Sequence, residues 1–234
     1  MNRQRSIGLI VGTSGYSDDE REHRRALLQR LLPPGCEARV EAVMDGPEFF
    51  DRGDHFADAA EAAVSYFRRL PPGVWDVIIW AGAIDPGLND IRTASPVPVV
   101  GPGEASMFVA ATLRTPVSVV TVDEHAVEKT YSMLGVLSTK PPIASVRSMD
   151  MPVRRIVQDR ELARRLLHRE VEAAVGSDGA GAVYLGAMTL ATLGVEEELR
   201  AAAGVPILSP LEVAAAAAAQ VALARPSHRL TENR

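Results

Sequence analysis

The chain has 234 residues, of which 47% are hydrophobic and 24% charged, as is typical of a globular protein with a substantial core. Its net charge of -5 gives no general attraction to nucleic acid or anionic membranes, so we expect neither as a partner. A single cysteine, Cys36, excludes an intrachain disulfide and a multi-cysteine metal site, and we interpret it as a structural thiol.

Two basic stretches, 21–30 and 154–169, contain interspersed acids, and this pattern favours solvated helix faces. The polar first five residues lead directly into an apolar strand, so we expect no signal peptide. The longest apolar run, 213–224, is mostly alanine and too short to span a bilayer. The sequence therefore predicts a cytoplasmic protein.

Short apolar segments alternate with longer helical patterns along the chain, and this order predicts parallel strands connected by helices. In the first half we predict strands over 6–11, 37–44, 74–80 and 97–100, and helices over 18–32, 56–70 and 104–113. In the second half we predict strands over 117–122, 143–149, 182–185 and 205–208, and helices over 124–134, 161–175, 195–203 and 211–224.

The similar order of elements in the two halves predicts an α/β protein of two pseudo-symmetric lobes, each a parallel sheet flanked by helices. We expect an N-terminal lobe over 1–113, a C-terminal lobe over 114–210, a closing helix over 211–225 and a flexible tail over 226–234. Ligands of open α/β sheets bind beyond the carboxyl ends of the strands. The active cleft is therefore expected between the lobes.

Two strand-end segments carry the most specific pattern of the sequence. The first is IIWAGAIDPGL over 78–88 followed by VPVVGPGEA over 97–105, and the second is AVYLGAMTL over 182–190. This pair resembles the motifs of the aspartate/glutamate/hydantoin racemase superfamily, and the resemblance covers about 6–221. In that family each motif usually presents a cysteine, and the two thiols exchange a proton across a substrate carbon. Gly82 and Ala187 occupy the two cysteine positions here.

The resemblance implies a cofactor-independent enzyme that acts on a small carboxylate, an amino acid or a cyclic amide, and a homo-oligomer. Gly82 and Ala187 cannot transfer protons, so the resemblance does not extend to two-cysteine racemisation. The backbone amides of the two turns are still suited to holding an anion. Neither a metal-ligand spacing nor a dinucleotide-binding glycine pattern stands out, so we expect no metal and no cofactor.

Four titratable residues are candidates for non-thiol acid/base chemistry. Asp85 lies three residues after Gly82 and becomes a base if burial raises its pKa, or else it caps the turn. Glu104 begins a helix, where a carboxylate also suits the positive helix end. Asp123 and His125 follow the strand at 117–122 and supply a carboxylate and an imidazole. Alternatively, Asp123 caps the next helix and His125 lies on its exposed first turn.

A second group of residues is expected to bind the substrate or its anionic group. At the end of the first strand, Thr13 and Ser14 either hold a carboxylate or cap the following helix. Thr189 is placed to donate a hydrogen bond to an oxyanion, and Met188 to shape the pocket. The full predicted set is Thr13, Ser14, Gly82, Ala83, Thr121, Val122, Ala187, Met188 and Thr189.

Three hypotheses about function follow. The first is an enzyme with non-thiol acid/base chemistry on one side of the substrate, acting as a lyase, decarboxylase, hydrolase or isomerase. The second is a small-carboxylate binding protein that kept the anion pocket without catalysis. The third is a racemase whose cysteines were replaced by engineering. We adopt the first as the expectation.

Overall fold

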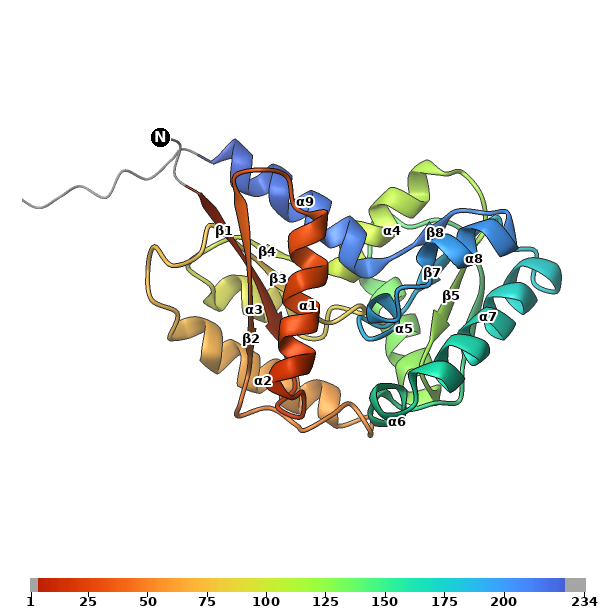
Figure 1. The fold of residues 1–234 in the computed structure, drawn as a ribbon, viewed down its shortest axis with the longest axis horizontal. Coiled ribbons are helices and arrows are strands. Elements are labelled where there is room, and N and C mark those ends of the chain that lie inside the picture. Colours follow the sequence, from red (N-terminus) through yellow and green to blue (C-terminus); the bar gives the residue numbers. More distant parts are fainter. Residues whose placement is uncertain (1–3, 226–234) are drawn as a thin grey trace, which may run out of the picture.

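The computed structural model describes residues 4–225 and contains two α/β lobes, each built on a four-stranded parallel sheet (Figure 1). The first sheet has the order β2-β1-β3-β4, with β1 (Arg5–Val11), β2 (Cys36–Ala42), β3 (Val77–Trp80) and β4 (Val99–Val100). The second has the order β6-β5-β7-β8, with β5 (Val117–Thr121), β6 (Ile143–Ser148), β7 (Ala182–Leu185) and β8 (Ile207–Leu208). The matching orders confirm the predicted pseudo-symmetric α/β architecture.

Helices connect successive strands and cover the sheets (Figure 1). In the first lobe they are α1 (Asp18–Leu31), α2 (His55–Arg68), α3 (Leu88–Ala94) and α4 (Pro102–Thr112). In the second they are α5 (Glu124–Val136), α6 (Val153–Gln158), α7 (Arg160–Gly176), the 3₁₀ turn η1 (Leu190–Thr192) and α8 (Glu196–Ala203). No helix within residues 4–225 is long and apolar enough to cross a bilayer.

The central strands explain why these segments fold as parallel sheets. Every residue of β1, β3, β5 and β7 is buried, as expected for strands covered on both faces. Cys36, at the start of β2, is buried as well, and burial raises the pKa of its thiol. The prediction of a structural thiol is therefore confirmed.

The last helix, α9 (Pro210–Ala224), returns from the second lobe to the first, where it packs against α4, α1, β1 and β3 (Figure 1). Its inner face is alanine, with Ala214, Ala215 and Ala218 fully buried, and these small side chains allow close approach to the sheet. The tail predicted over 226–234 lies outside the described residues.

The short elements differ most from prediction. The helices α3 and α6 were not predicted, because their seven and six residues give no clear helical period. The strands β3 and β8 begin at Val77 and Ile207, later than the predicted starts at 74 and 205. The strand predicted over 97–100 pairs only at Val99 and Val100. Proline cannot donate to a ladder, and Pro98 precedes this short pair.

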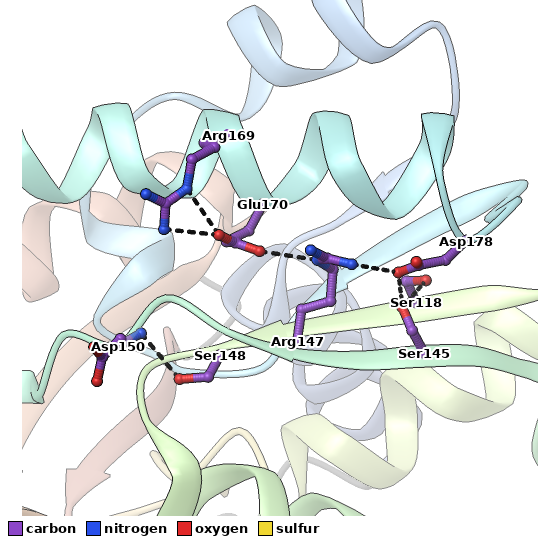
Figure 2. A network of polar contacts seen from close by, with 8 residues as sticks. All are labelled: Ser118, Ser145, Arg147, Ser148, Asp150, Arg169, Glu170 and Asp178. Carbon is purple, nitrogen blue, oxygen red and sulfur yellow. Dashed lines mark hydrogen bonds and ion pairs between the residues drawn. The ribbon is translucent and has the colours of Figure 1, made fainter.

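The outer strand of the second sheet, β6, is attached to α7 by polar side chains (Figure 2). Arg147 Nε donates to Glu170 at 2.9 Å, and its Nη1 donates to Asp178 at 2.8 Å. Asp178 also accepts from Ser145, which in turn bonds Ser118 of β5 at 2.7 Å. Every residue of β6 is half-buried. The polar network therefore holds β6 in place, as apolar packing holds the fully buried strands.

Candidate active site

A cavity of about 50 Å³ lies between the lobes, at the carboxyl ends of β1, β3 and β7. Gly82 and Ala187 both line it, so the two motif positions share one cavity. Phe50, Phe56 and Val153 contribute apolar walls from both lobes. Of the predicted binding residues, those that line it are Thr13, Gly82, Ala83, Val122, Ala187, Met188 and Thr189.

The two other predicted binding residues serve the local backbone instead. The Ser14 hydroxyl donates to the carbonyl oxygens of Gly46 and Pro47 at 3.3 and 3.4 Å, which attaches the first turn to the loop after β2. The Thr121 hydroxyl donates to the Gly186 carbonyl at 3.2 Å and fixes the turn before Ala187. Neither lines the cavity, because each hydroxyl is committed to a carbonyl next to it.

None of the four predicted acid/base residues lines the cavity. Glu104 pairs with Arg92 at 2.5 Å on the surface. Asp123 caps α5 by accepting from the Ala126 amide at 2.9 Å, and His125 lies exposed on the first turn of that helix. The structure therefore contains the alternative arrangement, in which Asp123 caps the helix and His125 is exposed.

Asp85 is the best placed of the four, yet its carboxylate serves α4. It accepts from the backbone amides of Gly103 at 3.0 Å and Glu104 at 2.5 Å, at the positive end of that helix. Burial raises the pKa of Asp85 to about 7 in spite of these two bonds. Its backbone is left-handed, with φ of 52°, which turns the side chain toward α4.

Gly82 is required by the packing around it. A Cβ built there would lie 2.5 Å from Cδ of Pro86, closer than real contacts, so a cysteine at this position needs Pro86 to move. The Gly82 amide donates to the Trp80 carbonyl at 2.7 Å and is therefore not free to bind an anion. The close approach of Pro86 argues against the replacement of a native cysteine at position 82.

Residues of both lobes contribute hydrogen-bond donors to the cavity lining. Thr13 Oγ1 is buried without a partner among the described residues. The backbone amides of Ala187, Met188 and Thr189 have no acceptor within residues 4–225. Because a buried donor without a partner is unfavourable, these groups are suited to an anionic or carbonyl ligand.

Arg24, which was not predicted as a site residue, lines the same cavity from the middle of α1. Its residue exposure is 1%, which corrects the interpretation of 21–30 as a solvated face. Arg24 lies one turn before the buried Leu28, and Glu20 lies one turn before Arg24. The four-residue spacing places Arg24 on the same helix face as the buried Leu28, and this pattern could have identified Arg24 from the sequence.

Buried and surface contacts hold the lobes together around the cavity. The Tyr184 hydroxyl of β7 donates to the Ala83 carbonyl at 2.6 Å, and the hydroxyls of Tyr16 and Thr189 lie 3.0 Å apart. At the surface, Arg154 of α6 pairs with Glu48 and Asp51. The cavity is thus enclosed by both lobes.

A family model described as Asp/Glu/Hydantoin racemase matches residues 20–218. The chain belongs to this racemase family. Hydantoin racemase from Rhizobium meliloti is 32% identical over 192 residues, covering 81% of this chain and 79% of the relative. Hydantoin racemase from Paenarthrobacter aurescens is 25% identical over 180 residues, covering 76% and 72%.

Solved structures of other proteins have the same fold. Allantoin racemase from Pseudomonas fluorescens superposes with a TM-score of 0.83 at 22% identity, covering 97% of this chain and 94% of that one. A glycine-to-cysteine variant of arylmalonate decarboxylase in its sulfate-associated form gives 0.62 at 19% identity, covering 98% of each chain. A protein named as a racemase and a protein named as a decarboxylase therefore share this fold.

The chemistry open to this racemase-family site follows from its donors. Within the described part of the chain, no group of three or more His, Cys, Asp or Glu side chains is placed to hold a metal ion. Among residues 4–225, those that line the cavity contribute guanidinium, hydroxyl and amide donors, but no carboxylate, imidazole or thiol. Such a site can stabilise negative charge on a ligand, and it offers no conventional side-chain base.

Proposed function

We propose that this protein is a cofactor-independent enzyme of the racemase scaffold that binds a small carboxylate or cyclic amide between its lobes and acts on it by one-sided chemistry. Decarboxylation of an activated carboxylate is the reaction that the site suits best. The observation that supports this proposal is a cavity with several unpartnered donors and no side chain that accepts a proton at neutral pH.

Two-base racemisation is excluded from the proposal on chemical grounds. It needs a base on one face of the reacting carbon and an acid on the other. Gly82 and Ala187 supply neither, and Asp85, Glu104, Asp123 and His125 do not line the cavity. The reaction must therefore generate the carbanion without removal of a proton by the protein.

Decarboxylation meets this requirement. The bond between the reacting carbon and one carboxylate breaks, carbon dioxide leaves, and the electron pair remains as an enolate on the neighbouring carbonyl. The amides of Ala187 to Thr189 and the Thr13 hydroxyl are donors for that enolate oxygen. A water molecule then protonates the carbon, and the hydroxide that remains combines with the released carbon dioxide to give bicarbonate.

The test is to incubate the protein with aryl- and alkylmalonates in deuterated water and to follow carbon dioxide release and product labelling by NMR. We expect a product with one deuterium at the former malonate carbon. Thr13→Val removes one donor and should slow turnover by about 100-fold if it contacts the enolate. Ser14→Ala, whose hydroxyl is bonded outside the cavity, is the matched control and should retain activity.

Loss of optical rotation from a hydantoin, with exchange of its α-proton, would contradict the proposal and indicate two-sided proton transfer. Binding of malonates without turnover of any of them would instead favour a small-carboxylate binding protein. That second candidate function draws its support from the same absence of a proton acceptor in the cavity lining.

A further inference from the structure

We propose that Arg24 determines the ligand class of this protein by binding a carboxylate group, so that the cavity prefers a carboxylate to the neutral amide of the same skeleton. This inference rests on the proposed ligand site. The sequence relatives are named as hydantoin racemases, so a carboxylate preference sets this chain apart from the ring compounds in those names.

The first observation is the placement of the guanidinium. Arg24 is among the largest fully buried side chains of the described structure, and it lines the cavity together with Thr13 and Tyr16. Its Cζ lies 4.1 Å from the centroid of the Tyr16 ring, which supports the cation on one face. A long charged side chain is rarely buried unless it is paired, so its partners decide its role.

The second observation is an imbalance of charge around Arg24. Its Nη2 lies 3.2 Å from Glu20 Oε1 as an ion pair, but without hydrogen-bond geometry. The other oxygen of Glu20 already accepts from Arg160 Nη2 at 2.6 Å. One carboxylate thus serves two guanidinium groups, so two formal positive charges face one formal negative charge.

The third observation is the unused donor. Arg24 Nε is buried and has no hydrogen-bond partner in the part of the chain that the structure describes, and Thr13 Oγ1 is in the same state. A ligand carboxylate can accept from the guanidinium in a charge-assisted bond and also compensates the excess positive charge. A neutral amide supplies an acceptor but leaves the charge uncompensated.

The probe pair for the test is malonate and malonamide, which share a skeleton and differ in charge. Isothermal titration of the wild-type protein should show malonate binding at least tenfold more tightly, which is about 1.4 kcal/mol. Arg24→Met keeps most of the side-chain length without the charge, and leaves Glu20 paired with Arg160. We expect this variant to lose the preference and to retain malonamide affinity.

Arg25→Met is the matched control, because Arg25 is the next residue of α1 and pairs with Glu22 at the surface. It should keep the wild-type preference for malonate. Arg24→Lys, which retains a charge but lacks Nε, should give an intermediate ratio and is a second variant if Arg24→Met does not fold.

The outcomes separate this inference from the proposed function. Equal affinity of the wild-type protein for malonate and malonamide, or an unchanged ratio in folded Arg24→Met, would overturn the role of Arg24 and leave the ligand site standing. Failure of the wild-type protein to bind either probe or any malonate of the turnover assay would count against the proposed function itself.

Discussion

The buried hydrogen bond between Tyr184 and Ala83 makes a direct prediction about how the lobes are held together. Tyr184 is fully buried in β7, and its hydroxyl donates to the Ala83 carbonyl at 2.6 Å across the lobe boundary. Burial and the nearby Asp85 raise the pKa of Tyr184 well above its ordinary value, so this hydroxyl remains a donor throughout the neutral range. The substitution Tyr184→Phe tests the contribution of this hydrogen bond to stability.

The substitution removes one oxygen atom and leaves the ring in place, so the core loses a hydrogen bond without a large cavity. Ala83 accepts from no other donor among the described residues, and an unpaired buried carbonyl costs about 1–3 kcal/mol. At about 2 kcal/mol, and with an unfolding entropy of about 0.5 kcal/mol/K for 234 residues, Tm should fall by about 4 °C.

Thermal unfolding followed by circular dichroism measures this change, and urea titration gives the corresponding free energy of unfolding. Tyr131→Phe is the control, because Tyr131 is 55% exposed on α5 and should shift Tm by less than about 1 °C. Equal Tm values for the two variants would refute the reasoning, since the bond across the lobes would then contribute nothing to stability.

Two further predictions concern Asp85 and the network of Figure 2. Since burial raises the pKa of Asp85 from 3.8 to about 7, the folded state holds this proton more tightly than the unfolded state, and its contribution to stability is lost as pH rises through this interval. Relative to Asp85→Asn, the wild-type protein should lose up to about 4 kcal/mol between pH 4 and 8 in urea titrations; parallel curves would contradict this. Arg147→Ala should lower the free energy of unfolding by about 1.5 kcal/mol, whereas Arg165→Ala, which breaks an exposed pair with Glu161, should change it by less than about 0.5; equal losses would show that the network adds no stability.

Much of the fold could be predicted because parallel sheets leave a strong sequence signal. The strands β1, β3, β5 and β7 are fully buried and rich in Val, Ile and Leu, and the helices between most of them are long enough to show a period. The short elements α3 and α6 were missed for the opposite reason. Strand-end motifs located the cavity because the carboxyl ends of parallel strands meet at one edge.

The side chains of the site were harder to predict than its position. Asp85 lies three residues after Gly82 in sequence, yet a left-handed backbone turns its carboxylate onto α4 instead of the cavity. Arg24 is distant from both motifs, and a basic residue in a charged helix resembles a solvated one until the face of the helix is known. Sequence spacing gives neither the rotation of a helix nor the direction of a side chain after a tight turn.

The return of α9 to the first lobe has a mechanical consequence. Within the described residues the backbone passes between the lobes twice, over 113–116 and at Ser209, next to the packed helices α4 and α9 (Figure 1). Two neighbouring connections act as a hinge and restrict rigid-body motion to rotation about the line that joins them. The opposite rim, where Arg154 meets Glu48 and Asp51 in solvent-exposed ion pairs, is then the side that widens. Small molecules would enter past α6 while the paired connections stay fixed.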